Sequence, residues 1–182
     1  KSTKIVMPKK CPSCETLIIK IPNQSTYKCT NEDNCLPQVM QSIQHFASRK
    51  AMNISGLGES LVETLVNNHI IKNYADLYVL DIKSLLNLDR MALKSSTNLI
   101  NSIIKSKNIT FDRFLYSLGI REVGVSTSRV LSKSFSTIDM LMNADKTELE
   151  MINDIGPIVG ENIYEFFKLQ KNKNNILKLI NN

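Results

Sequence analysis

Long apolar runs are missing from this chain of 182 residues. No segment approaches the roughly 20 apolar residues of a membrane-spanning helix, and the basic start KSTKIVMPKK is not followed by the apolar core of an export signal. Tryptophan is absent and aromatic residues make up only 6% of the chain, which argues against a platform that stacks single-stranded bases. We therefore expect a soluble, cytoplasmic protein without a membrane partner.

Glycine and proline are also scarce, with six and five residues, so nothing predicts low complexity or extended disorder. Two of the glycines, Gly56 and Gly58, stand in NISGLGESLV, where an apolar helical pattern begins. Neither the third glycine of a dinucleotide fingerprint nor the Gly-Lys-Ser/Thr of a P-loop follows them. The first residue is Lys1 rather than Met, from which we expect a piece excised from a longer protein.

All four cysteines lie within 25 residues, with the spacing C-x2-C-x14-C-x5-C: Cys11, Cys14, Cys29 and Cys35. This clustering predicts one structural zinc ion held by four thiolates, with a short β-hairpin formed by ETLIIKI and STYKC. Two disulfides are the alternative, but they require an exported protein. The x5 interval is longer than the common x2 knuckle, and His45 is a further candidate ligand.

Charge is segregated along the chain, whose net charge is +6 and whose pI is near 9.1. Residues 83–133 contain nine basic and three acidic residues, whereas residues 134–167 contain one basic and seven acidic residues. An excess of positive charge favours a polyanionic partner, so the basic block predicts a phosphate-facing surface. The alternative is a helix face that is merely solvated.

A repeat of 32 to 34 residues follows the cysteines, with Gly58, Ala92, Gly124 and Gly156 in similar surroundings. The residues one and four positions before each, and seven positions after, are all apolar. The repeat predicts pairs of helices around tight turns. We expect them at 40–51 and 59–68, 76–87 and 93–106, 110–118 and 125–134, and 145–152 and 157–170.

This pattern, h-x-x-h-x-G-h-G with a small residue four positions further on, is that of a helix-hairpin-helix motif. Glycine permits positive φ in the turn and close approach of a ligand to the main chain. The N–H groups in the first turn of the second helix then favour an anion, such as a DNA phosphate. The alternative is that Gly-x-Gly only makes a tight corner between helices.

The segments PKKCPSC, HFASRKAMNISGLGESLVETLV, ADLYVL, LYSLGIREVG and INDIGPIVGENI together resemble the C-terminal half of bacterial NAD-dependent DNA ligase over residues from about 5 to 170. The x5 spacing is a feature of that family. The resemblance implies a clamp around nicked duplex DNA that acts in replication and repair. It also implies that adenylation, with NAD and a divalent metal as cofactors, takes place in missing N-terminal domains, because no Lys-x-Asp-Gly occurs here.

The resemblance further implies roles for individual residues. The four cysteines hold zinc, and the turns contact the minor-groove backbone of the DNA. Arg90 and Ala92 replace both glycines in the second turn, and Asp154 replaces the first glycine in the fourth. The expected DNA-binding residues are Gly56, Gly58, Arg90, Lys94, Ser95, Arg121, Gly124, Ser126, Thr127, Arg129 and Gly156; we expect no catalytic residue.

We therefore predict a mainly α-helical protein in which a four-cysteine zinc finger with a small β-hairpin precedes four helix-hairpin-helix motifs in two paired units. The expected divisions are 1–10 as a linker from a missing OB-fold, 11–36 as the finger, 37–175 as the DNA-binding domain and 176–182 as a C-terminal tail. Two alternatives remain open: a free-standing module that binds DNA structures in repair or recombination, and a helical-repeat scaffold for protein partners.

Overall fold

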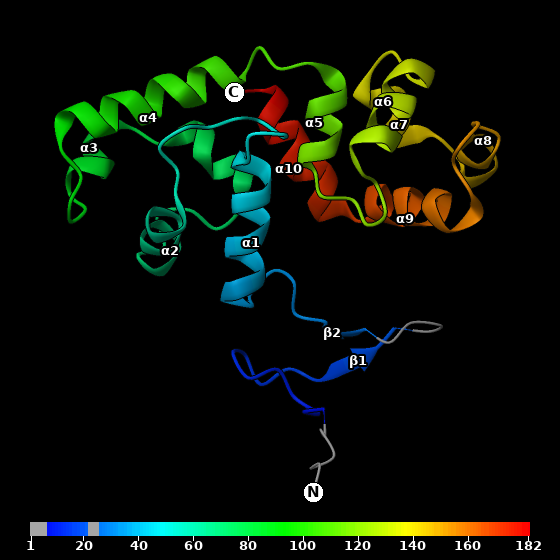
Figure 1. Ribbon diagram of the computed structural model, residues 1–182, viewed down its shortest axis with the longest axis horizontal. Coiled ribbons are helices and arrows are strands. Elements are labelled where there is room, and N and C mark those ends of the chain that lie inside the picture. Colours follow the sequence, from blue (N-terminus) through cyan, green and yellow to red (C-terminus); the bar gives the residue numbers. More distant parts are fainter. Residues whose placement is uncertain (1–6, 22–25) are drawn as a thin grey trace, which may run out of the picture.

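A computed structural model describes residues 7–21 and 26–182 of the chain (Figure 1). Residues 1–6 of the expected linker and 22–25 of the expected hairpin turn lie outside the described residues. The described part is mainly helical with one two-stranded sheet, which confirms the predicted fold class. No helix in it is both long and apolar enough to cross a membrane.

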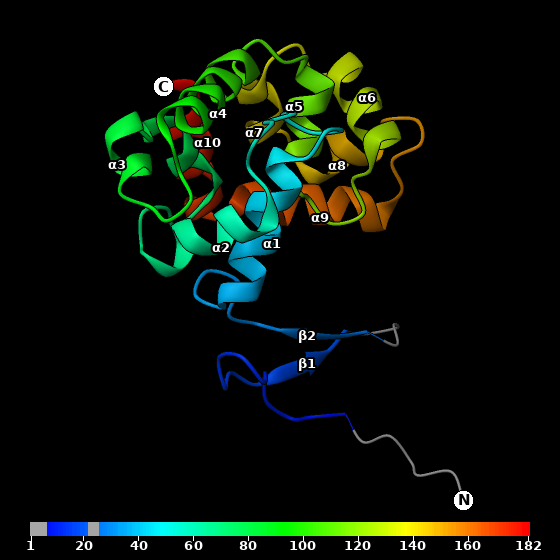
Figure 2. The same cartoon turned by 60° about the vertical axis from the view of Figure 1, so that its left-hand side comes forward.

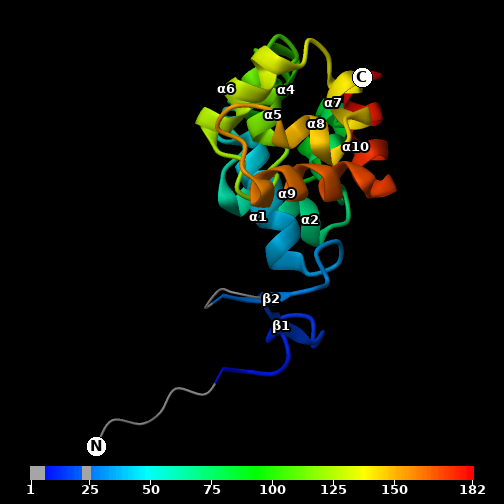
Figure 3. The same ribbon diagram turned by 90° about the vertical axis from the view of Figure 1, so that its right-hand side faces the viewer.

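The sheet pairs β1 (Ile18–Lys20) with β2 (Tyr27–Cys29) in antiparallel register, with Ile18 opposite Cys29. It extends below the helices in Figures 1 and 3, and joins them through α1 (Leu36–Ala47). A second connection is ionic, because Lys171 Nζ at the start of the last helix lies 2.8 and 2.9 Å from the two carboxylate oxygens of Asp33.

The helices form two units around separate apolar cores, one of buried residues between 39 and 103 and one between 115 and 176. Figure 2 shows the first unit on one side of the molecule and the second unit on the other. The first unit contains α1, α2 (Glu59–Asn67), η1 (Tyr74–Val79), α3 (Ile82–Leu86) and α4 (Leu93–Ser106). The second contains α5 (Phe111–Ser117), α6 (Val125–Ser134), α7 (Ile138–Asn143), α8 (Lys146–Glu150) and α9 (Pro157–Lys168).

The two units repeat each other in detail. In the first, Asn73 caps η1 and the Asp81 side chain accepts a hydrogen bond from Ser84 N–H at the start of α3. Sixty-four residues later, Thr137 caps α7 and Asp145 caps α8 in the same way. These caps divide the expected helix 76–87 into η1 and α3, and they start α7, which the repeat pattern did not predict.

The last helix, α10 (Gln170–Ile180), runs through the boundary at residue 175 where we expected a tail to follow. Ile176 is completely buried in the second core, and Leu179 packs against the first. Lys178 Nζ lies 2.5 Å from Asp76 Oδ1, and that carboxylate also caps η1. Residues 176–180 therefore hold the two units together.

Small residues occupy the places where paired helices cross. A Cβ at Gly160 of α9 would lie 3.1 Å from Glu150 Cγ of α8. The equivalent residues of α4 and α6 are Ser96 and Ser128, both completely buried. Neither hydroxyl has a hydrogen-bond partner among the described residues.

Replacing Ser128 with Ala is expected to stabilise the protein by about 1 kcal/mol, because a buried hydroxyl without a partner costs roughly 1–3 kcal/mol. Urea unfolding measures the change. Ser132→Ala on the same helix is the control for helix propensity. The Ser132 hydroxyl donates a hydrogen bond to Arg129 O, so removing this hydroxyl relieves no unsatisfied group and is not expected to stabilise the protein in this way. A Ser128→Ala protein less stable than the parent would contradict this account of the crossing.

Candidate metal centre and nucleic-acid interface

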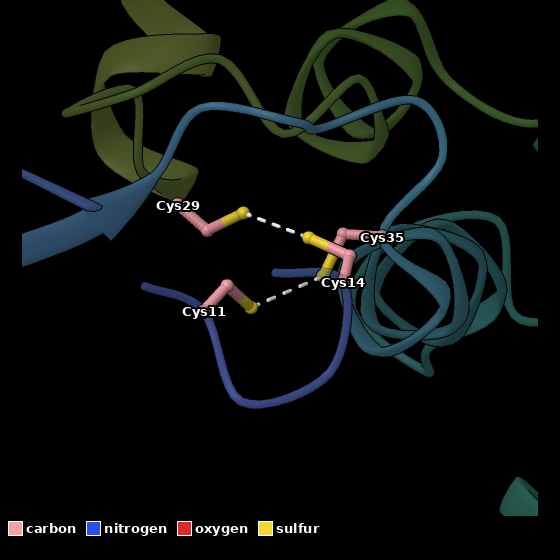
Figure 4. A group of neighbouring side chains, drawn as sticks. All are labelled: Cys11, Cys14, Cys29 and Cys35. Atoms are coloured by element: carbon pink, nitrogen blue, oxygen red, sulfur yellow. Dashed lines mark hydrogen bonds between the residues drawn. The ribbon is translucent and has the colours of Figure 1, made fainter. Parts of the chain in front are cut away.

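The four cysteine sulfurs converge on one point from three separate elements (Figure 4). Cys11 and Cys14 flank a tight turn, Cys29 ends β2, and Cys35 precedes α1 as its N-cap. All four sulfurs lie within 4.8 Å of one another. The sulfurs of Cys14 and Cys29 are 3.5 Å apart, and those of Cys11 and Cys35 are 3.8 Å apart.

These separations fit a tetrahedral metal ion. Four metal–sulfur bonds of about 2.3 Å place the sulfurs roughly 3.8 Å apart, whereas a disulfide requires about 2.05 Å. Both cysteine pairs are therefore arranged as ligands rather than as disulfides. The x5 interval also has a structural reason: residues 31–34 form a turn, closed by a hydrogen bond from Cys35 N–H to Asn31 O, that leads from the strand into the helix.

The thiols differ in acidity. Hydrogen bonds from the side chain and backbone of Thr16 lower the pKa of Cys14 to about 6. At Cys29 a backbone hydrogen bond to Asn31 lowers the pKa, but burial and the thiols of Cys14 and Cys11 outweigh it and raise the pKa to about 11. Desolvation also raises the pKa of Cys35. Crowded thiols resist ionising together, and a bound cation removes that resistance.

His45, considered above as a further ligand, is not in the cluster. Its Nε2 lies 2.9 Å from Tyr116 O, and its ring packs edge-on against Tyr116 and against Gly119. This contact joins α1 of the first unit to α5 of the second. His45 therefore has a packing role.

Each helix pair is joined by a turn, which we name hairpin 1 (residues 48–58), hairpin 2 (87–92), hairpin 3 (118–124) and hairpin 4 (151–156). All four end in the same way. The residue two before the helix N-cap has positive φ, at 89° for Gly56, 63° for Arg90, 59° for Glu122 and 68° for Asp154. The N-caps are extended, with φ between −106° and −78°: Gly58, Ala92, Gly124 and Gly156.

The glycines at the N-caps are not required by the fold. Their φ values suit any residue, and a Cβ built on Gly58, Gly124 or Gly156 would meet no described atom within 4 Å. A glycine that neither backbone conformation nor packing within the protein requires is typical of a place where a ligand approaches the backbone closely. By contrast, Gly56 has a conformational reason, because its φ is strongly positive.

The first amides of α2 that bond to the Gly58 carbonyl are those of Leu61 and Val62, and the first amide of α6 that bonds to the Gly124 carbonyl is that of Ser128. The N–H groups before them in each helix have no partner inside the helix. Hairpin 2 differs. The Ala92 N–H donates to Ser95 Oγ at 3.0 Å, and the Ser95 hydroxyl donates back to Ala92 O at 2.9 Å. The expected DNA-binding hydroxyl of Ser95 therefore caps its own helix.

Hairpin 4 also differs, since Pro157 removes one N–H from the first turn of α9. Carboxylates of Asp154 and Glu161 lie on this hairpin and helix, and Glu161 forms an ion pair with Lys146. Sequence reasoning had identified Asp154 as a departure from the glycine pattern. The missing N–H donor at Pro157 is a second departure in the same hairpin.

The expected basic residues are placed as follows. Arg90 and Lys94 are exposed and have no ion pair among the described residues. Arg121 Nε is 3.9 Å from Glu122, and Arg129 Nε is 3.8 Å from Asp112. Ser126 is exposed and Thr127 half-buried in the first turn of α6.

Sequence reasoning missed Arg49. It lines a hollow of about 550 Å³ beside hairpin 1 together with Asn53 and Ser55. Arg49 therefore places a cation within hairpin 1 itself.

Comparison with known proteins agrees with this architecture. A family model described as a helix-hairpin-helix motif matches residues 113–176, which contain hairpins 3 and 4. A DNA ligase from Chlorobium phaeobacteroides (strain BS1) is 43% identical over 164 residues. The match covers 90% of this chain and 24% of that ligase, so the chain spans about a quarter of the relative's length. The chain is therefore a homologue of part of a DNA ligase, and it joins a four-cysteine cluster to helix-hairpin-helix motifs.

Proposed function

We propose that this chain binds nicked duplex DNA through the backbone of the minor groove, without regard to sequence, as part of an NAD-dependent DNA ligase. The observation that carries the proposal is the shared backbone of the four hairpins, with N-cap glycines whose missing side chains leave open space outside the protein. Main-chain amides at helix N-termini favour phosphate oxygens, and phosphate contacts carry no base information.

The proposal assigns structural zinc to the four cysteines, because a closed set of four thiolates suits zinc and leaves no open position for catalysis. Adenylation and sealing belong to other domains of the parent ligase, together with NAD and its divalent metal. No Lys-x-Asp-Gly occurs in this chain to carry the adenylate.

The hairpins contribute unequally in this proposal. Hairpins 1 and 3 present main-chain amides beside Gly58 and Gly124. Hairpin 2 relies more on the side chains of Arg90 and Lys94, because Ser95 occupies the Ala92 N–H at its N-cap. Hairpin 4 contributes least, because Asp154 and Glu161 repel phosphate.

Arg90 and Asp154 test this inequality, because they occupy the same left-handed position in hairpins 2 and 4. Asn tolerates that conformation, so Arg90→Asn and Asp154→Asn change charge without changing the turn. Arg90→Asn is expected to weaken binding to a nicked duplex and to reduce the salt slope by roughly one unit. Asp154→Asn is expected to leave affinity unchanged or to raise it.

Fluorescence anisotropy across a salt series measures both variants, after circular dichroism has shown that each is folded. Equal losses of affinity in the two variants would mean that all four hairpins act as equivalent clamps. A parent chain that binds DNA only with a marked sequence preference, or whose binding ignores salt, would refute the proposed function itself.

A further inference from the structure

We propose that the exposed face of α4 is a second contact surface for the DNA backbone, beyond the hairpins. This inference rests on the proposed function. The surface, which we name the α4 stripe, consists of Lys94, Asn98, Asn101 and Lys105. Their spacing of four, three and four residues places them on one side of the helix over about 16 Å, at 1.5 Å per residue.

The fold does not need the α4 stripe. All four of its side chains are exposed, whereas the opposite face of α4 is buried in the first core through Leu99 and Ile103. Figure 1 shows α4 as a long helix at the outer edge of the molecule. The stripe therefore faces away from the rest of the chain.

Two of the four second helices, α4 and α6, contain no acidic residue. In α6 Arg129 lies 3.8 Å from Asp112, whereas neither Lys94 nor Lys105 of α4 has an ion pair in the part of the chain that the structure describes. In α9, the equivalent helix of the second unit, Glu161 pairs with Lys146 and Glu165 pairs with Lys168. An ordinary solvated helix face carries both signs of charge, as α9 does.

The positions of hairpins 1 and 2 indicate the path of the DNA backbone. Hairpin 2 ends at the N-terminus of α4, and hairpin 1 lies against the side of α4, where Ser55 N–H donates to Ser102 Oγ at 2.7 Å. Gly56 packs on Leu99 of the same helix. A phosphate backbone that touches both hairpins passes along α4.

The chemistry of the stripe matches that path. Lysine ammonium groups and asparagine amides donate hydrogen bonds to phosphate oxygens and sugars whatever the base sequence. Exposed Leu93 and Ile104 lie along one edge of the stripe and offer apolar contact to the sugars. In hairpin 2 the Ser95 hydroxyl occupies the Ala92 N–H, so the side chains on α4 add to the contact that the remaining main-chain amides can make.

Lys105 provides the test, because it lies in the last turn of α4, three turns from hairpin 2, and its loss leaves both hairpins intact. Lys105→Ala is expected to weaken binding to a nicked duplex several-fold at low salt, with a salt slope lower by roughly one unit. Lys105→Glu is expected to weaken it further. The measurement is fluorescence anisotropy of the 182-residue chain between about 50 and 200 mM salt.

The matched control is Lys168→Ala, which removes the same charge from the last turn of α9, where Lys168 is paired with Glu165. It is expected to change neither affinity nor slope. If the parent chain binds DNA with a salt slope and the Lys105 variants behave as Lys168→Ala does, the α4 stripe makes no contact and only this inference fails. A parent chain without salt-dependent DNA binding overturns the proposed function and this inference together.

Discussion

Removing the metal from the four-cysteine site is expected to unfold residues 7–35 and to leave the helices folded. This segment has two strands of three residues each, and only Cys11 and Cys35 among its described residues are buried apolar side chains. A hairpin of that size is at best marginally stable alone. In small zinc domains metal binding supplies about 10–16 kcal/mol, which is the free energy of folding itself. Both helical cores lie beyond residue 38 and do not depend on the metal.

Elemental analysis is expected to find one zinc ion per chain in the folded parent protein. In the Cys29→Ser variant it is expected to find almost none. Ser13→Ala is the control, because Ser13 is exposed between Cys11 and Cys14 and is not a ligand. After chelation, hydrogen exchange should become fast in residues 7–35 while circular dichroism keeps its helical signal. Substantially less than one ion per well-folded parent chain would defeat the zinc assignment.

Ile176→Ala is expected to destabilise the protein by about 2–5 kcal/mol, because it leaves a cavity in the second core at a completely buried residue. A protein of this size has a free energy of unfolding of about 5–15 kcal/mol, so the loss is a large part of it. Urea unfolding measures the change. Leu177→Ala is the control on the same helix, where the side chain is 44% exposed, and it should cost much less.

Deletion of residues 176–182 extends this test. It also removes Leu179 from the first core and the Lys178–Asp76 ion pair, and the two units are then expected to unfold in separate transitions. A truncated chain as stable as the parent, or equal effects of Ile176→Ala and Leu177→Ala, would show that α10 does not hold the units together.

Local signals in the sequence located the cysteine cluster and the start of each second helix. The predicted starts at residues 59, 93, 125 and 157 are those of α2, α4, α6 and α9. A helix start is determined by a few adjacent residues, here an extended N-cap after a turn with positive φ. The spacing of the repeat therefore carried this information even at Ala92, where glycine is absent.

Contacts between distant segments were not predictable in the same way. Ile176 lies beyond the last repeat, and its burial depends on the second core, so residues 176–182 were expected to form a tail. Positive φ at Arg90, Glu122 and Asp154 contradicts the usual preference for glycine, at a cost of roughly 1–2 kcal/mol each. The residue types alone do not reveal that conformation, but each of the three aligns in the repeat with Gly56, whose φ is also positive.

The attachment of α10 to both units has a consequence for the strength of binding. If the hairpins bind duplex DNA as proposed, engagement of one pair places the other pair at a high effective concentration over the same duplex, because the units are fixed to each other. Individually weak phosphate contacts then combine into slow dissociation. If α10 melted, residues 107–110 and the α1–α5 contact of His45 with Tyr116 would still link the units, but more loosely, and such a protein would leave the DNA faster.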